Sequence, residues 1–212
     1  MNYKYAKALQ KGGHLDKAAD VYYLLAQITP DEANIYYNNV VNMFNEAKMY
    51  DKAVEAAAKV AELKPEDADA QYNLGYMHIQ MDQYEKAIAA FNRTLEIRPD
   101  FEFALMQIGF AYNKLKKYRD SIAAYKKLIE INPQSDFAWL NMGIGYMLLK
   151  QWDNALEPML KTIELKPENG TAYYNLAICY LNLKDNHSAR NIYQQLKEVD
   201  ASLAQQLLKY FR

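Results

Sequence analysis

The side chains best suited to metal binding or redox chemistry are few and widely spaced in this chain. Its three histidines are His14, His78 and His187, and no two of them lie four residues apart, as two zinc ligands on one helix face would. The single cysteine, Cys179, cannot form an intrachain disulfide or a cysteine metal cluster. We expect Cys179 to be a small buried thiol, and we predict neither a metal site nor a cofactor.

Sequence motifs for catalysis are absent as well. The chain has no glycine-rich phosphate loop, no HExxH and no GxSxG. Its many carboxylates fall in turns and on outward faces, where charged residues are ordinarily solvated. His78 stands at a position that is tyrosine in later repeats. We therefore interpret it as a packing residue whose ring is satisfied by hydrogen bonds. The sequence therefore predicts a protein that is not an enzyme.

Charge and hydropathy argue against nucleic-acid-binding and membrane-spanning proteins. The chain has 25 Lys and Arg against 26 Asp and Glu, whereas nucleic-acid-binding proteins usually carry a basic excess. No segment approaches the roughly 18 consecutive apolar residues that a membrane-spanning helix needs, so we expect no direct membrane insertion. The start, MNYKYAKALQ, lacks the apolar core of a signal peptide. We expect a cytoplasmic protein unless a targeting segment precedes residue 1.

A repeat of about 34 residues organises the whole chain. Five prolines mark its period, with spacings of 35, 34, 34 and 34 residues: Pro30, Pro65, Pro99, Pro133 and Pro167. A small residue lies twelve positions before each of them, at Ala18, Ala53, Ala87, Ser121 and Ala155, and Ala189 continues this column. Several columns in phase over about six units indicate a repeat architecture.

Within each unit the apolar residues have helical spacing. They recur at i, i+3, i+4 and i+7 in two stretches separated by a short polar turn, such as KGG at 11–13 or MDQ at 81–83. Small residues, such as Gly143 in the first helix and Ala155 in the second, let the two backbones approach closely. Proline ends the second helix, and polar residues suited to N-capping follow it: Asp67, Asp100, Ser135 and Asn169.

These columns resemble the tetratricopeptide repeat, whose pattern is W-x2-L-G-x2-Y, then A-x3-F, then P. The fifth unit follows the pattern closely, with Trp139, Gly143, Tyr146, Ala155 and Pro167. The resemblance implies an all-α, right-handed superhelical solenoid of about six helix-turn-helix hairpins in a single domain, residues 1–212. We place the hairpins at 1–33 (truncated), 34–67, 68–101, 102–135, 136–169 and 170–203. Residues 202–212 are predicted to form a C-terminal capping helix whose apolar stripe is Leu203, Leu207, Leu208 and Phe211.

In this family the first helices of the hairpins line the concave side of the solenoid, so the resemblance implies that this wall is the binding groove. Its positions are polar towards the N-terminus and apolar or aromatic in the later units, which is typical of an interaction surface. The predicted groove residues are Tyr72, Tyr76, Phe103, Met106, Phe110, Asn113, Phe137, Leu140, Ile144, Met147, Tyr174 and Ile178.

The predicted function is a non-catalytic adaptor that binds a partner protein's peptide or amphipathic helix in this apolar groove. The alternative is a self-assembling oligomeric scaffold in which the first hairpin and the terminal helix meet a second copy. Pro158, inside a predicted helix, indicates either a local bend that adjusts curvature or a kink that shapes a binding site. RNA binding by the similar pentatricopeptide repeat is disfavoured by the glycine column and the balanced charge.

Overall fold

The computed structural model describes residues 2–211, which are helical with short connections and contain no strand. This confirms the all-α solenoid of helical hairpins. Contacts between residues divide the chain into two compact units, the first ending at Gln107 and the second beginning at Ile108. Helix α7 (Glu102–Lys114) contributes its first residues to the first unit and its remaining residues to the second. Each unit is described by itself.

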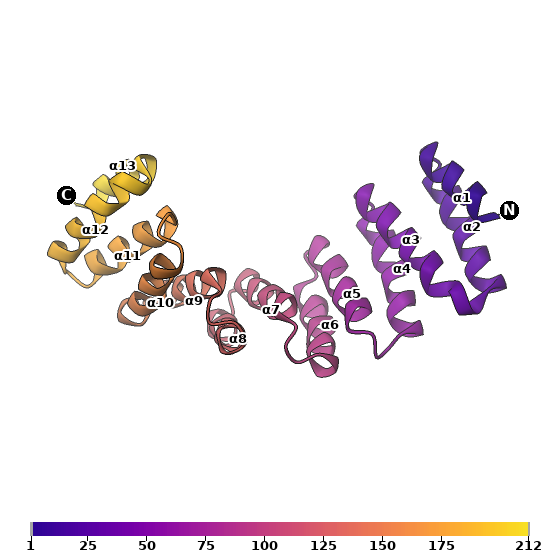
Figure 1. Ribbon diagram of the computed structural model, residues 1–212, viewed down its shortest axis with the longest axis horizontal. Helices are drawn as coiled ribbons and strands as arrows, with labels where there is room; N and C mark the ends of the chain where they lie inside the picture. The colour runs from indigo at the N-terminus through magenta and orange to yellow at the C-terminus, as the bar shows by residue number, and fades with distance from the viewer. Residues whose placement is uncertain (1, 212) are drawn as a thin grey trace. The chain divides into compact units, whose positions relative to one another are not determined.

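The first unit is a row of antiparallel helices in which each helix packs on the next (Figure 1). Its elements are α1 (Asn2–Lys11), α2 (Leu15–Ile28), the 3-10 helix η1 (Pro30–Glu32), α3 (Ala33–Glu46), α4 (Tyr50–Leu63), α5 (Ala68–Gln80) and α6 (Tyr84–Ile97). Tyr22, Phe44 and Met43 are fully buried in its core.

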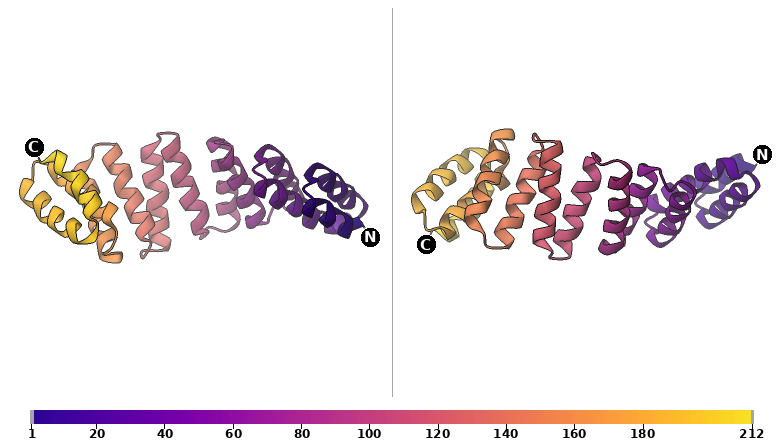
Figure 2. Two further views of the ribbon diagram at one scale, coloured as in Figure 1. Left: turned by 90° about the horizontal axis from the view of Figure 1, so that it is seen from above. Right: turned by 90° about the horizontal axis from the view of Figure 1, so that it is seen from below.

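The second unit continues the same pattern, and Figure 2 shows its successive helices side by side. Its elements are α8 (Tyr118–Ile131), α9 (Asp136–Leu148), α10 (Trp152–Leu165), α11 (Gly170–Asn182), α12 (Asn186–Val199), α13 (Ala201–Leu207) and the 3-10 helix η2 (Leu208–Tyr210). Helix α13 packs on both α11 and α12, as a capping helix would.

The predicted terminal helix differs from the observed one in length and in its apolar stripe. Helix α13 ends at Leu207, and a 3-10 turn carries the chain to Tyr210, so the α-helix does not extend to residue 211. Leu207 is buried, but Leu208 is 47% exposed and does not belong to the packed stripe. The tighter 3-10 winding rotates the side chains after Leu207 away from the α-helical register. Residue 212 lies outside the described part of the chain.

Helix ends follow the local sequence. The second helix of each of the first five hairpins ends two residues before its proline, as at Leu63 before Pro65, which agrees with the bias against helix before proline. Asp67, Ser135 and Asn169 accept backbone N–H groups as N-caps. The prediction of Asp100 as a cap is wrong, because the backbone carbonyl of Phe101, one residue later, accepts the first helical hydrogen bonds of α7.

In the third and fourth hairpins, a glycine of the first helix lies in close contact with an aromatic ring of the second helix. A Cβ atom added at Gly75 would lie 2.6 Å from the ring of Phe91, and one added at Gly109 would lie 2.5 Å from the ring of Tyr125. The hydroxyl of Ser121 donates a 2.9 Å hydrogen bond to the carbonyl of Gly109. At Gly75 and Gly109 the partner ring therefore occupies the space of a side chain, and at Gly143 the side chain of Met159 occupies it.

Candidate protein-binding site

None of the twelve predicted groove residues is buried. Phe103 and Phe137 are exposed, at 63% and 38%, and the other ten side chains are half-buried. The half-buried residues divide their surface between the core of their own unit and solvent. For example, Tyr76 packs against the first core, while Leu140 and Ile144 pack against the second. The wall is therefore partly core and partly accessible surface in each unit.

In the first unit, an aromatic cluster surrounds the predicted residue Tyr72. Its ring stacks on Phe101 with centroids 5.1 Å apart and contacts Phe91 at 5.5 Å. Phe103 meets Phe101 edge-on at 6.4 Å. Burial raises the pKa of Tyr72, and a hydrogen bond with Gln107 opposes part of that effect. Such a cluster fixes ring positions but leaves Phe103 available for contact.

An open pocket of about 560 Å³ lies beside this cluster. Phe103 and Met106 of the predicted set line it, together with four charged residues: Asp69 of α5, Glu102 at the start of α7, and the loop residues Arg98 and Asp100. Arg98 donates a 2.7 Å hydrogen bond to Asp69, and its guanidinium lies 3.9 Å from the ring centre of Phe101. These loop residues are missing from the predicted set, because the repeat pattern assigns the groove only to positions on the first helices of the hairpins.

In the second unit, three predicted residues from two helices meet at one pocket. Met147 of α9 and Tyr174 and Ile178 of α11 line a pocket of about 380 Å³. The remaining lining residues are Asn175, Leu181, Asn182 and Tyr210. The pocket thus has a wall of four large side chains, with two amides and a phenol among them. We call these seven residues the α9–α11 groove.

Tyr210 is a groove residue that the sequence does not predict. It belongs to the 3-10 turn after α13, and burial together with a hydrogen bond to Tyr210 raises the pKa of Tyr174. The sequence pattern predicts only a capping role for this segment, because its α-helical stripe passes through Leu207 and Phe211. The 3-10 turn brings Tyr210 to the groove instead.

The other predicted residues of the second unit lie outside the α9–α11 groove. Phe137 packs edge-on against Tyr125 with centroids 6.0 Å apart, and the ammonium of Lys114 lies 5.2 Å from the ring centre of Phe110. The side-chain oxygen of Asn113 is buried and has no hydrogen-bond partner in the described structure. These three residues do not meet at a single pocket with Met147 and Ile178.

Cys179 and His78, whose side chains could take part in catalysis or metal binding, are instead packed within the fold. Cys179 is fully buried, and burial raises the pKa of its thiol to about 12, so the reactive thiolate is suppressed. The Nδ1 atom of His78 lies 2.9 Å from the side-chain oxygen of Gln83. Within residues 2–211, no three His, Cys, Asp or Glu side chains gather into a set that could hold a metal ion. No helix of that part is long and apolar enough to cross a membrane.

The fold and groove define a helical-repeat protein with apolar surface on the first helices of its hairpins. Three segments match family models for the tetratricopeptide repeat, at residues 68–101, 104–135 and 159–191. The chain belongs to the tetratricopeptide repeat family. Such repeats are generally non-catalytic interaction modules, and their presence supports a protein-interaction role for this chain.

Solved structures support the fold independently. A crystal structure of MamA protein matches with a TM-score of 0.76 and 20% identity, covering 82% of this chain and 96% of that one. A MamA segment from Desulfovibrio magneticus RS-1 matches with a TM-score of 0.72 and 20% identity, covering 80% of this chain and 96% of that one. YrrB, described as a TPR protein with an unusual peptide-binding site, matches with a TM-score of 0.73 and 20% identity. The match covers 90% of this chain and 99% of that one. The comparison with curated proteins found no match.

Proposed function

We propose that the chain is an adaptor that binds an apolar peptide segment of a partner protein in the α9–α11 groove. The observation that carries the proposal is the convergence of Met147, Tyr174 and Ile178 at one open pocket of about 380 Å³. This volume lies within the range of about 300–1,000 Å³ that is typical of ligand sites. YrrB, with a similar fold, is described as having a peptide-binding site, which supports the same class of ligand.

The chemistry of the groove favours an amphipathic helix or an extended segment with spaced apolar side chains. Met147, Ile178 and Leu181 offer a flexible apolar wall, and burial of one large apolar side chain is worth about 1.5–3 kcal/mol. Asn175 and Asn182 supply amides that can pair with a peptide backbone at the edge. The groove offers no charged side chain, so an ionic anchor is not part of the proposed recognition.

Selection from a displayed library of random peptides, with the purified chain as target, tests the proposal. We expect enriched peptides to carry large apolar residues at helical or alternating spacing. Ile178→Glu places a charge on the apolar wall, and we expect it to weaken binding of an enriched peptide by roughly tenfold or more. Circular dichroism should show unchanged helicity, because Ile178 is only half-buried.

Leu160→Glu is the matched control. Leu160 is also an apolar helical residue of the second unit, but it is 47% exposed on α10 and does not line the groove. The control variant should bind the selected peptide as the wild type does. Equal binding by Ile178→Glu and the wild type, or an equal loss in Leu160→Glu, would exclude the α9–α11 groove as the site.

A further inference from the structure

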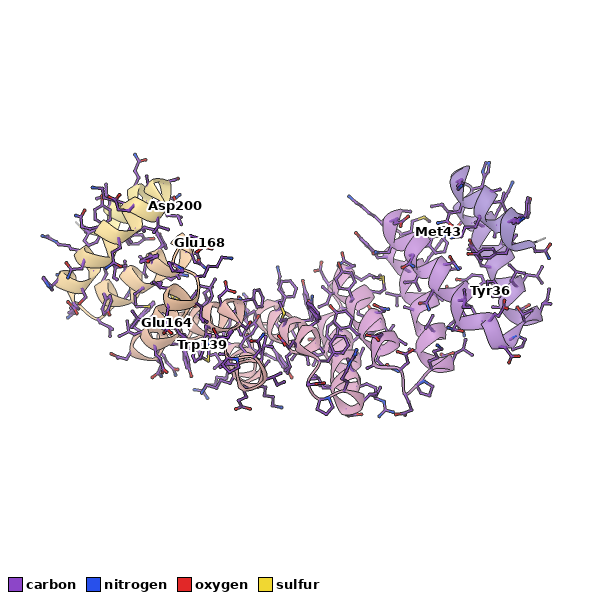
Figure 3. The ribbon with its side chains drawn as sticks, in the orientation of Figure 1. Tyr36, Met43, Trp139, Glu164, Glu168 and Asp200 are labelled. Atoms are coloured by element: carbon purple, nitrogen blue, oxygen red, sulfur yellow. The ribbon has the colours of Figure 1, made fainter. Side chains whose placement is uncertain are left out.

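A second pocket of the second unit lies on a different side of α9. It has a volume of about 400 Å³ and is formed by α8, α9 and α10. Its α9 residues are Trp139, Met142 and Tyr146, whereas Leu140, Ile144 and Met147 lie on the groove side of the same helix. With 3.6 residues per turn, these two sets point in roughly opposite directions from the helix axis. We call this second site the Trp139 pocket; Trp139 is labelled in Figure 3.

The wall of the Trp139 pocket is aromatic and fixed in place. The indole N–H of Trp139 donates a 2.9 Å hydrogen bond to the carbonyl of Pro133, which holds the ring at the start of α9. Met142 and Pro158 are buried beneath the pocket, while Trp139 and Tyr146 keep part of their surface accessible. Rings with an accessible face bind cations through their quadrupole.

Carboxylates surround this aromatic wall. Glu130 of α8 and Asp153 and Glu157 of α10 line the pocket and are exposed. None of the three takes part in an ion pair between described residues. The pocket therefore presents three negative charges against one positive charge, that of Lys126. This excess of negative charge complements a cationic ligand group.

Pro158 is a lining residue that interrupts the backbone hydrogen bonds of α10. The helix α10 continues through this proline, which has no N–H to donate to the carbonyl of Asn154, four residues earlier. Asn154 itself lines the pocket. The proline thus removes the donor that an ordinary helix would supply to this carbonyl.

The chain already places a cation at the aromatic wall. The ammonium of Lys126 lies 5.8 Å from the ring centre of Tyr146, within the range of about 6 Å for a cation–π contact. Lys126 is exposed, and its flexible side chain can leave this position. The contact shows that the ring face accepts a positive charge, and it makes Lys126 a competitor for an incoming one.

The charged pocket is particular to the fifth hairpin among its neighbours. One repeat earlier, Arg119 and Ala123 occupy the positions of Asp153 and Glu157, and one repeat later His187 and Asn191 occupy them. The position of Pro158 holds Ala124 or Ile192 in those repeats. Packing of the repeat therefore does not require the two carboxylates or the proline.

We propose that the Trp139 pocket binds an arginine side chain from a partner protein's segment, at a site separate from the α9–α11 groove. The guanidinium is planar and stacks on Trp or Tyr, and its five N–H donors match two or more carboxylates. A lysine ammonium offers three donors and does not stack. Anionic and neutral segments lack the charge that the three carboxylates complement.

Amide NMR of the full chain provides the test, because the sequence has two tryptophans, Trp139 and Trp152, whose indole signals are separate reporters. The probe is the blocked tripeptide acetyl-Gly-Arg-Gly-amide, compared with the same peptide carrying Gln in place of Arg. We expect a saturable shift of the Trp139 indole signal with the Arg peptide and little response to the Gln peptide. The Trp152 signal, from a residue that does not line the pocket, should change less.

Variants distinguish binding in this pocket from binding elsewhere on the chain. Asp153→Asn combined with Glu157→Gln should weaken binding of the Arg peptide by roughly tenfold, and Lys126→Met should strengthen it, since the competing ammonium is removed. Glu168→Gln, an exposed carboxylate beyond the end of α10, should bind as the wild type does. Ile178→Glu should also leave this binding unchanged, so failure of the groove proposal and failure of this one are distinguishable.

The proposal is overturned by any of three results. These are the absence of a saturable Trp139 shift with the Arg peptide, an equal response to the Gln peptide, and binding that survives the Asp153→Asn and Glu157→Gln changes. The residues substituted in and near the pocket are exposed, and the dispersion of the remaining amide signals reports whether each variant keeps its fold.

Discussion

His78 is a half-buried imidazole whose environment opposes protonation. Burial is the main cause that lowers its pKa below the ordinary value of 6.5, and Lys86 acts in the same direction, while the hydrogen bond with Gln83 opposes them. The unfolded chain therefore binds a proton at this residue at a higher pH than the folded chain does. The contribution of neutral His78 to stability is complete above pH 6.5 and is lost as the pH falls towards the folded pKa.

We predict that His78→Tyr reduces the loss of stability between about pH 7.5 and about pH 5. Tyrosine is the residue of the later repeats at this position, as in Tyr112 and Tyr146, and it does not titrate in this range. Urea unfolding of the wild type and the variant at both pH values measures the effect. The same pH-dependent loss in both proteins would show that His78 is not its source.

At the residue scale, the sequence could predict which side chains form the apolar wall but not how much of each is accessible. Helical periodicity places Tyr72, Leu140 and Ile144 on the first-helix wall, yet their half-burial depends on three-dimensional contacts, such as those of Tyr72 with Phe91 and Phe101. Tyr210 could not be predicted, since its position depends on a 3-10 turn whose winding the apolar pattern does not encode.

At the scale of elements, the hairpins that carry Gly75, Gly109 or Gly143 depend on the absence of a side chain at this position of the first helix. An alanine Cβ at Gly109 would lie 2.5 Å from the ring of Tyr125, which is buried and cannot withdraw. We predict that Gly109→Ala destabilises the chain, because overpacking costs about 1–3 kcal/mol and exceeds the helix-propensity gain of roughly 1 kcal/mol. Urea unfolding should show the lower stability.

Gly12→Ala is the control for this prediction. Gly12 lies in the turn after α1, where an added Cβ would have its nearest neighbours at 3.4 Å, an ordinary contact. The stability of the Gly12→Ala variant should stay close to that of the wild type. If Gly109→Ala unfolds at the wild-type urea concentration, close packing is not the reason for the glycine column.

The helices and their ends could be predicted well from the sequence, because the same pattern recurs in several hairpins and fixes boundaries that one hairpin alone leaves ambiguous. One hairpin alone would leave its boundaries open, whereas five prolines in phase mark the helix ends to within two residues. The predictions fail where a single residue determines how a helix begins or ends. The first helical hydrogen bonds of α7 begin at Phe101 and not at Asp100, and the α-helical winding of the terminal segment changes to 3-10 at Leu208.

At the scale of the whole molecule, the two functional hypotheses differ in their preferred state in solution. An adaptor leaves its groove open for a different protein, whereas a self-assembling scaffold covers apolar surface with a second copy. We predict a monomer of 24.6 kDa in sedimentation velocity experiments over a wide concentration range. A dimer or larger species that grows with concentration would favour the scaffold instead.

The sequence could predict the repeat family but not the partner, since one fold serves many functions. Solved structures at 20% identity share the arrangement of helices with this chain, and that likeness extends to the fold alone. Partner choice depends on a few groove side chains, such as Met147 and Ile178, whose types vary freely without disturbing the hairpin. The single-domain interpretation of residues 1–212 stays a prediction.

The most direct test of the groove is methyl NMR of the chain with isotope-labelled methionines, titrated with a peptide selected for binding. Met147 lines the α9–α11 groove, whereas Met159 is fully buried in the same unit and serves as an internal reference. We predict a saturable shift of the Met147 methyl signal with little change at Met159. A bound peptide that leaves Met147 unshifted while it moves methionine signals of other surfaces would contradict the proposed site.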